Sequence, residues 1–180
     1  MASSEYCLIE TEIGECALVW QGAAIIGASL PADNRTALLT RLNRNFPGAT
    51  AHKTPSFLDE TVANIQALMA GEQASFRADL CDRSAIEPFA DQVYDITLSI
   101  PHGQTMTYGE VAVRLGGKHL SRAVGAALGA NPIPIIIPCH RVIAKDGGLG
   151  GFSAPGGANA KMRLLQIEGA FRIEKLPLFQ

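Results

Sequence analysis

The sequence has no long apolar run and no secretory leader, and both absences narrow its class. None of its 180 residues belong to a stretch of about 20 apolar residues, the length that a membrane-spanning helix requires. The N-terminus has no basic segment followed by an apolar run, so we expect no signal peptide and a cytoplasmic location. The chain also contains no internal repeat and no low-complexity tract.

Cysteine is scarce and never forms a C-x-x-C pair. The four cysteines are Cys7, Cys16, Cys81 and Cys139. Scattered cysteines in a cytoplasmic chain are usually reduced. Cys7 and Cys16 could supply two ligands of a zinc site, but no second pair accompanies them, so we expect no metal. Cys81 is interpreted as a packing or surface residue, which leaves Cys139 as the cysteine available for chemistry.

Charge is spread unevenly, although the net charge is only −2. Residues 1–87 hold 6 Lys and Arg against 11 Asp and Glu, whereas residues 88–180 hold 9 against 6. The positive second half is compatible with a polyanionic partner, and chance unevenness is the competing interpretation.

Residues 1–87 carry no catalytic motif and predict a small α/β domain. Three apolar segments separated by turn residues predict strands over Tyr6–Thr11, Cys16–Trp20 and Ala23–Leu30. A helix is expected from Asn34 to the Pro47-Gly48 turn. The pattern Ser56-Phe-Leu-Asp59 predicts a capping box at the start of a second helix.

Residues 88–180 predict a mostly helical domain that contains a helix-turn-helix. Pro88 suits the first position of a helix that runs to Ser99. Thr107-Tyr-Gly-Glu110 is a capping-box pattern for a short helix, and Ser121 can cap the next helix, Arg122 to Leu128. An ordinary helical hairpin is the competing interpretation.

The second of these short helices has little side-chain bulk. Its expected outer face consists of Arg122, Ala123, Gly125, Ala126 and Ala127. A glycine inside a helix costs about 1 kcal/mol relative to alanine, so a close approach must compensate for it. Insertion into a narrow groove and tight helix–helix packing are the two explanations.

Cys139 is the strongest candidate for chemistry. A proline-restrained apolar approach, from Asn131 to Pro138, delivers this thiol beside His140 and Arg141. A thiolate is the nucleophile, and a neighbouring imidazole and guanidinium favour thiolate over thiol. Successive side chains point in different directions, so a bridging water could connect His140 to Cys139.

Glu168 is the candidate for orienting the base. It ends a helix expected over residues 159–168, where a carboxylate opposes the helix dipole at a cost of about 0.3–1 kcal/mol. A carboxylate kept at this unfavourable end of a helix suggests a functional role. The alternative is an ordinary solvated glutamate on the surface.

A glycine-rich segment, residues 146–157, is the next feature. It lacks the Gly-Lys-Ser/Thr ending of a phosphate-binding loop, so nucleotide hydrolysis is not expected. Glycine lets the backbone approach a flat ligand, while Phe152 can pack against a ring and Ser153 can form a hydrogen bond with it. A surface loop is the alternative.

Pro138-Cys-His-Arg-Val142, with Asn131-Pro-Ile-Pro before it and Gly150-Gly-Phe-Ser after it, resembles the O6-alkylguanine-DNA alkyltransferases. The resemblance implies an α/β, ribonuclease-H-like domain over residues 1–87. It implies a mostly α, winged helix-turn-helix alkyltransferase domain over residues 88–180. The implied activity is irreversible transfer of an alkyl group to Cys139 from O6 of guanine, or from O4 of thymine, in a base flipped out of double-stranded DNA.

The same resemblance implies residue roles. His140 and Glu168 would form a water-linked relay that deprotonates Cys139, Tyr108 would rotate the target phosphate and assist proton delivery to the purine, and Asn131 would brace the turn. Arg122 would fill the gap left in the duplex. The implied minor-groove face is Ser121, Arg122, Ala123, Gly125 and Ala126, and the implied guanine pocket is Pro134, Val142, Phe152 and Ser153.

Two departures concern the size of the alkyl group rather than the nucleophile. Phe152 stands where many members have tyrosine, and the loop after it is longer than in some members. A methyl thioether has no good leaving group, so we expect each protein to repair one lesion. We also expect that the reaction requires no cofactor and no metal, and that the protein is a monomer. The alternatives are a damage-binding module without transfer activity and a cysteine hydrolase, although no oxyanion hole is identifiable for the latter.

Overall fold

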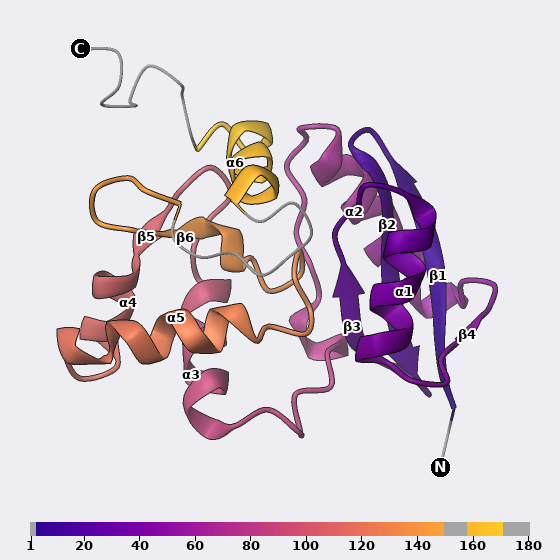
Figure 1. The fold of residues 1–180 in the computed structure, drawn as a ribbon, viewed down its shortest axis with the longest axis horizontal. Coiled ribbons are helices and arrows are strands. Elements are labelled where there is room, and N and C mark those ends of the chain that lie inside the picture. Colours follow the sequence, from indigo (N-terminus) through magenta and orange to yellow (C-terminus); the bar gives the residue numbers. More distant parts are fainter. Residues whose placement is uncertain (1–2, 150–157, 171–180) are drawn as a thin grey trace. The chain divides into compact units, whose positions relative to one another are not determined.

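The computed structural model describes residues 3–149 and 158–170 and divides into two compact units (Figure 1). The first comprises Met1–Ala85 and Pro132–Ile136, and the second comprises Ile86–Asn131 and Ile137–Gln180. The segment that leads to Cys139 therefore packs within the first unit, although both of its flanks belong to the second. In the described part of the chain, no helix is long and apolar enough to cross a membrane.

The first unit contains a four-stranded sheet in the order β3-β2-β1-β4. Antiparallel pairs join β1 (Ser4–Thr11), β2 (Gly14–Gln21) and β3 (Ala24–Ser29), and β4 (Thr50–Ala51) lies parallel to β1. The three predicted N-terminal strands are confirmed. The fourth strand was not predicted, because two residues are too few to show an alternating pattern.

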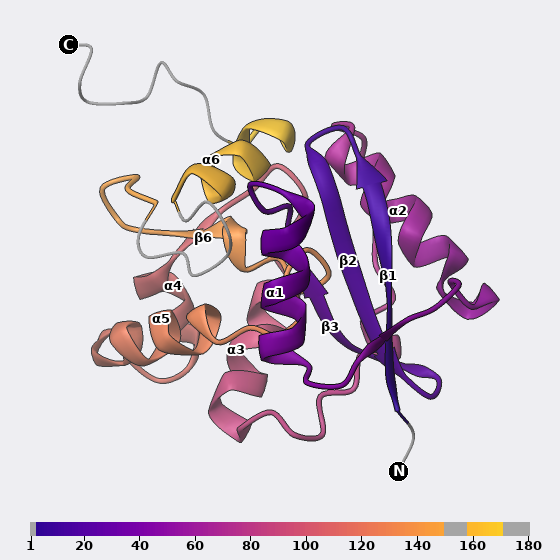
Figure 2. The same cartoon turned by 45° about the vertical axis from the view of Figure 1, so that its right-hand side comes forward.

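Two helices cover opposite faces of this sheet, α1 (Arg35–Asn45) on one and α2 (Asp59–Met69) on the other (Figures 1 and 2). Successive side chains of β2 point to alternate faces, so this central strand is buried on both sides. Ala17 and Val19 pack against Leu38 and Leu42 of α1.

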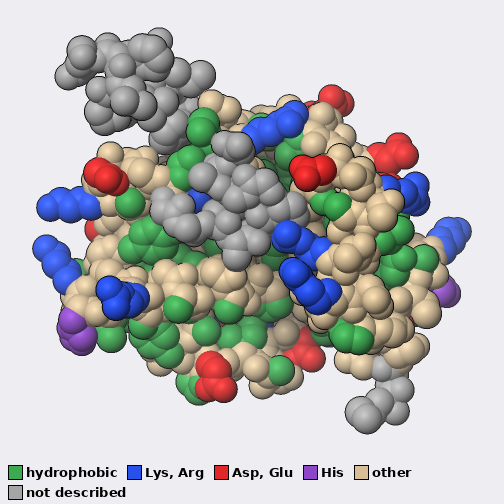
Figure 3. Space-filling model, in the orientation of Figure 1, with side chains coloured by type: hydrophobic (Ala, Val, Ile, Leu, Met, Phe, Trp, Pro, Cys, Tyr) green, Lys and Arg blue, Asp and Glu red, His purple; other side chains and the backbone are tan. Residues whose placement is uncertain are grey.

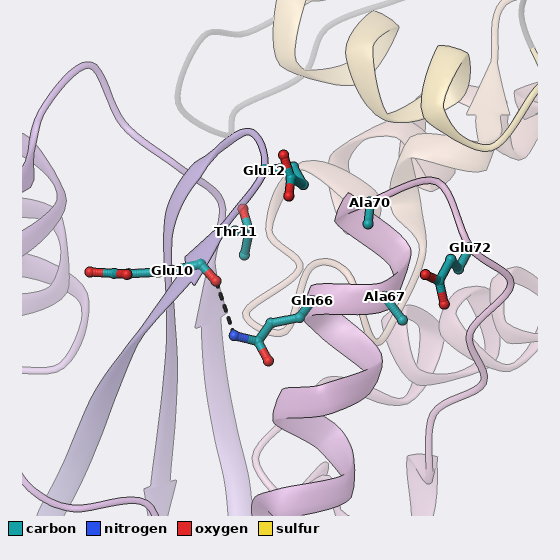
Figure 4. A pocket seen from close by; sticks show the side chains of 7 residues that line it. All are labelled: Glu10, Thr11, Glu12, Gln66, Ala67, Ala70 and Glu72. Atoms are coloured by element: carbon teal, nitrogen blue, oxygen red, sulfur yellow. Dashed lines mark hydrogen bonds between the residues drawn. The ribbon is translucent and has the colours of Figure 1, made fainter.

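The first unit also has a hollow of about 650 Å³ at the end of β1. Gln66 of α2 donates a hydrogen bond to the Glu10 carbonyl oxygen at 3.1 Å and so links α2 to this strand end (Figure 4). The hollow is lined mainly by polar and acidic side chains, among them Glu12 and Glu72.

One predicted helix start is confirmed in the first unit and another is wrong. The Asn34 side chain accepts a hydrogen bond from the Ala37 amide at 2.9 Å, as expected for a cap. Ser56 instead begins a 3₁₀ turn, η1 (Ser56–Leu58). The N-cap residue of α2 is Leu58, which forms no side-chain capping hydrogen bond. A further turn, η2 (Ala78–Leu80), precedes Cys81, which forms a β-bridge with Ile25.

The second unit is mostly helical, as predicted. Its helices are α3 (Pro88–Leu98), α4 (Tyr108–Arg114), α5 (Ser121–Gly129) and α6 (Ala158–Ile167), with 3₁₀ turns η3 (Lys118–Leu120) and η4 (Cys139–Arg141). A small parallel sheet pairs β5 (Met106–Thr107) with β6 (Val142–Ile143). Pro88 occupies the first turn of α3, and Thr107 and Glu110 form the predicted capping box of α4.

The predicted order of helix, short turn and helix is present in α4, η3 and α5. Gly116 begins the turn with φ of +118°, a conformation that side chains disfavour. The predicted cap by Ser121 is wrong, because η3 runs directly into α5 and the Ser121 hydroxyl donates to the Lys118 carbonyl oxygen at 2.6 Å. Tyr94 of α3 supports the inner side of α5 by donating to the Ala127 carbonyl oxygen at 2.8 Å.

Candidate active site around Cys139

Cys139 opens the η4 turn at the end of a buried apolar approach. Its amide donates to the Ile137 carbonyl oxygen at 2.8 Å, and only 5% of the residue is exposed. Ile135, four residues earlier, has φ of +79°, which a β-branched residue adopts only when its surroundings enforce it. Cys139 therefore stands on a restrained turn.

Asn131 links the two ends of this approach. Its side-chain amide donates to the Ile137 carbonyl oxygen at 2.9 Å. It also forms a hydrogen bond with the Cys139 side chain. The structure thus brings together the asparagine and the cysteine that were singled out from the sequence.

Cys139 is a thiol at rest, which corrects one expectation from the sequence. Burial raises the pKa of Cys139, and the Asn131 hydrogen bond and the charge of Lys161 offset only part of that rise. The neighbouring groups therefore do not hold a thiolate in the resting protein. Reaction needs a base that removes the proton as the bond to sulfur forms.

His140 and Glu168 form the pair expected from the sequence. Both are buried, and His140 Nε2 lies 2.8 Å from Glu168 Oε1. Burial lowers the pKa of His140, and this effect outweighs the opposing influence of Glu168. The second ring nitrogen, Nδ1, is buried without a hydrogen-bond partner among the described residues.

Arg141 does not serve the thiol as the sequence suggested. Its Nε and Nη2 donate to the two oxygens of Glu168, each at 2.9 Å, and its Nη1 donates to the Ile100 carbonyl oxygen at 2.7 Å. Burial raises the pKa of Glu168, but hydrogen bonds from His140 and Arg141 outweigh it and bring the pKa to about 2. Glu168 is therefore a buried carboxylate rather than a solvated one.

Lys161 is the cation that acts on Cys139, and it was missed in the sequence. It is 1% exposed, and its Nζ donates to the Tyr108 hydroxyl at 3.1 Å and to the Val142 carbonyl oxygen. Burial lowers the pKa of Lys161 to about 8, against the opposing effect of Cys139. A signal existed, because Lys161, Leu164, Leu165 and Glu168 have the spacing of one helix face.

Tyr108, the first residue of α4, belongs to the same buried group. Its ring centroid lies 5.3 Å from Lys161 Nζ, within the range of a cation–π contact. Burial raises the pKa of Tyr108, and the nearby Cys139 adds to the rise. The phenol is therefore protonated, and because an ammonium only donates, the Tyr108 proton is available to another acceptor.

The slim face of α5 lies as predicted, with one exception. Arg122, Ala123 and Ala126 are exposed, and Ser121 and Gly125 are half-buried. Ala127 is buried with Val124 and Leu128 on the inner side, so its placement on the outer face was wrong. A Cβ at Gly125 would lie 3.9 Å from the Tyr108 ring, which is ordinary contact.

The expected guanine pocket is described only in part. Val142 is fully buried and presents its carbonyl oxygen to Lys161. Pro134 is half-buried in the segment that packs within the first unit. Phe152 and Ser153 lie outside the described residues.

A groove of about 830 Å³ begins at Tyr108 and is bounded by α4, the start of α5 and the residues after β6. Its basic lining residues are Arg114, Lys118 and Lys145, and Val113 adds an exposed apolar side chain. Figure 3 shows Lys and Arg side chains and a histidine gathered over η3 and the neighbouring helix ends. This surface suits a polyanion that carries apolar sugars or bases.

Residues 3–149 and 158–170 contain no group of three His, Cys, Asp or Glu side chains that could hold a metal ion. Cys7 and Cys16 are both buried in the sheet of the first unit. The zinc site considered from the sequence therefore finds no third ligand in the described part of the chain.

Comparison with known proteins gives consistent matches. The family model for the 6-O-methylguanine DNA methyltransferase DNA-binding domain matches residues 88–170. A methylated-DNA–protein-cysteine methyltransferase of Mycobacterium tuberculosis is 35% identical over 176 residues, or 97% of this chain and 98% of that protein. One from Salmonella typhimurium is 50% identical over 129 residues, or 72% and 67% of the two chains.

Solved structures agree with these matches. The structure of Mycobacterium tuberculosis OGT in complex with DNA is similar to this chain with a TM-score of 0.71 and 33% identity. The similarity covers 97% of this chain and 96% of that one.

Proposed function

The chain belongs to the methylated-DNA–protein-cysteine methyltransferases, a family of direct-reversal DNA repair enzymes, and from that premise we propose that Cys139 is its alkyl acceptor. The observation that carries this assignment is the geometry around the thiol. Cys139 is the cysteine that adjoins a buried His140–Glu168 pair and faces Lys161. Cys7, Cys16 and Cys81 belong to the first unit, where the buried polar residues described are Ser29 and Thr61.

The reaction joins sulfur to the alkyl carbon while the bond from that carbon to O6 of guanine breaks. The Cys139 proton passes through a bridging water to His140, whose charge Glu168 stabilises. Tyr108 gives its proton to the purine, which leaves as a neutral base, and Lys161 stabilises the resulting phenolate through its hydrogen bond. The product is a thioether, so each protein reacts once.

DNA is the partner, bound through the minor groove by the slim outer face of α5. Arg122 at the start of this face occupies the space left by the flipped nucleotide. The basic groove beside Tyr108 holds the backbone of the same strand. Support comes from the exposed, nearly bulk-free surface formed by Arg122, Ala123 and Ala126.

Assignments of fold, oligomeric state and residue roles complete the proposal. The first unit is ribonuclease-H-like and the second a winged helix-turn-helix, supported by the mixed sheet between helices and by the α4–η3–α5 arrangement with its small sheet. The protein acts as a monomer, since one chain supplies the Cys139 thiol, the His140–Glu168 pair, the Tyr108 phenol and the Lys161 ammonium. Asn131 braces the turn, and Pro134 and Val142 form part of the guanine pocket.

The test of the nucleophile uses a duplex that contains radiolabelled O6-methylguanine. Label should move to the protein, reach at most one equivalent per chain and stay there, and C139A should receive none. C81A is the matched control and should react like the wild type. Release of the label with continued turnover would show a hydrolase, and labelling of C139A would place the acceptor elsewhere.

The test of the DNA-binding mode compares two substrates. R122A should slow repair of duplex O6-methylguanine but leave the reaction with free O6-benzylguanine nearly unchanged, because Arg122 is exposed whereas His140 and Glu168 are buried. R44A, which removes an exposed arginine of α1, is the control. Equal losses on both substrates would remove the proposed role of Arg122. Duplex binding should also weaken as salt rises, because phosphate contacts release counterions.

A further inference from the structure

Arg141 adjoins the nucleophile in sequence but directs every described contact of its guanidinium away from it. Two nitrogens bind both oxygens of Glu168 at 2.9 Å, and the third binds the Ile100 carbonyl oxygen at 2.7 Å. Both partners of this ion pair are buried. A bidentate pair of this kind sets both the charge and the orientation of the carboxylate.

This geometry determines where the proton of His140 lies. A guanidinium only donates, so both Glu168 oxygens act as acceptors toward Arg141, and Oε1 also faces His140 Nε2 at 2.8 Å. An ionised carboxylate has no proton to give, so Nε2 must carry the hydrogen of that bond. A neutral imidazole has a single N–H, which leaves Nδ1 with a free lone pair.

The unpartnered state of Nδ1 agrees with that deduction. Nδ1 is buried and accepts no hydrogen bond from the described protein groups, as expected of an atom kept available for a proton. We propose that Arg141 is a positioning residue that keeps Glu168 ionised and locks His140 in the Nε2–H tautomer, so that Nδ1 receives the proton of Cys139. The last part of this statement rests on the proposed function, whereas the tautomer does not.

Within residues 3–149 and 158–170, Arg141 is the Lys or Arg residue that pairs with Glu168. Lys161 influences both Cys139 and His140, but its ammonium is bound to Tyr108 and to the Val142 carbonyl oxygen. From the loop after α3, the Gly103 amide approaches Glu168 Oε2 at 3.5 Å, and the adjacent His102 has a buried Nε2 without a described partner. Neither group supplies the fixed pair of donors that Arg141 provides.

The direct test is nitrogen NMR of the histidine side chains in the intact protein without DNA. Comparison with H140Q assigns the His140 signals. The wild type should show a protonated Nε2 and an unprotonated Nδ1. R141Q should lose this single tautomer, giving a mixture or a doubly protonated ring, and R141K should restore it in part. A wild-type Nδ1–H tautomer, or an unchanged spectrum in R141Q, would overturn the proposal.

The kinetic test uses free O6-benzylguanine, so that DNA contacts do not enter. R141Q should lower the limiting first-order transfer rate by about 10- to 100-fold, which is part of the acceleration that a positioned general base provides. The substrate concentration that gives half of the limiting rate should change little. Burial is the largest cause of the lowered pKa of His140, and the Arg141 charge lowers it further. Without that charge the pKa of His140 should rise, so the pH–rate profile of R141Q should rise at higher pH than that of the wild type. R141K should lie between the two.

A loss of folding is separated from a loss of positioning by thermal unfolding of each variant. If R141Q does not fold, the wild-type tautomer and the R141K profile still decide the question. A folded R141Q with the wild-type rate and profile would refute the role of Arg141. A wild-type protein that shows the expected tautomer but transfers no alkyl group would refute the proposed function and leave the tautomer lock standing.

Discussion

The two units differ most in the polar groups that they bury. The buried polar residues described in the first unit are the hydroxyl residues Ser29 and Thr61. The second unit buries four residues of the basic and acidic types, His140, Arg141, Lys161 and Glu168, in addition to Thr97. Burying a charge is costly unless it is paired, so a cluster of this kind in one unit alone marks the place where the fold serves chemistry rather than stability.

The carboxylates around the hollow of the first unit differ in the same way from the buried Glu168 of the second unit. The lining of this hollow includes Glu10, Glu12 and Glu72, all of them exposed residues, and the Glu10 carboxylate points away from the hollow (Figure 4). These groups remain solvated and need no partner. The carboxylate of Glu168, in contrast, has Arg141 and His140 as hydrogen-bond partners and a pKa of about 2.

The largest effect is expected from breaking the buried pair. E168Q places an amide NH₂ toward donors of Arg141 or His140 and leaves a buried guanidinium unpaired. The free energy of unfolding should fall by about 3–5 kcal/mol, and alkyl transfer should be largely lost. The matched change in the first unit, E15Q, removes only a surface contact with Arg35 at 3.5 Å and should cost at most about 1 kcal/mol. Similar losses in urea unfolding of the two variants would contradict the contrast between the units.

The buried ammonium should make stability depend on pH in the alkaline range. Lys161 has a pKa of about 8 in the folded protein against an ordinary 10.5, so between these values the unfolded chain binds more protons. Unfolding free energy due to this group therefore rises with pH from about 8 to 10.5, by about 3 kcal/mol if the full difference is expressed.

The comparison with K161M isolates this contribution. K161M should be at least as stable as the wild type at pH 7, because an apolar side chain replaces a desolvated charge, and this advantage should shrink as pH rises toward 10.5. Transfer should nevertheless fall in K161M. The exposed control K118M should show neither effect, and a constant stability difference across this pH range would contradict the burial of a charged Lys161.

The slim face of α5 provides a test in which stability and function move in opposite directions. G125A adds a Cβ in ordinary contact with Tyr108 and should stabilise α5 by about 1 kcal/mol. If this face enters a narrow groove, repair of duplex O6-methylguanine should slow, while the reaction with free O6-benzylguanine should not. Slowing on both substrates would assign the effect to Tyr108 instead.

The smallest difference is expected between the helix caps of the two units. N34A in the first unit and T107A in the second each remove a side-chain acceptor at a helix start, and each should cost about 1 kcal/mol. Thermal unfolding should show nearly equal losses, since neither cap touches a buried charge. Loss of transfer in T107A beyond this stability effect would mean that the cap also positions Tyr108.

Local patterns predicted much of the fold because their causes are local. Apolar segments bounded by turn residues identified β1, β2 and β3, and the Thr107–Glu110 spacing identified the start of α4. The caps assigned to Ser56 and Ser121 were wrong because a 3₁₀ turn precedes each helix, and sequence spacing does not distinguish such a turn from a cap. The cytoplasmic location stays a prediction.

The sequence by itself determined the family and singled out Cys139, His140 and Glu168, which the structure brings together. The sequence sufficed because a proline-restrained Cys-His-Arg segment with its flanks is highly specific to this family. Only the tertiary structure decided which polar groups each buried cation contacts. Arg141, next to Cys139 in sequence, turns to Glu168, while Lys161, 22 residues from the thiol in the printed numbering, acts on Cys139 and Tyr108. The physical reason is that charges pair according to distance and burial in the folded core, and chain neighbours point in different directions.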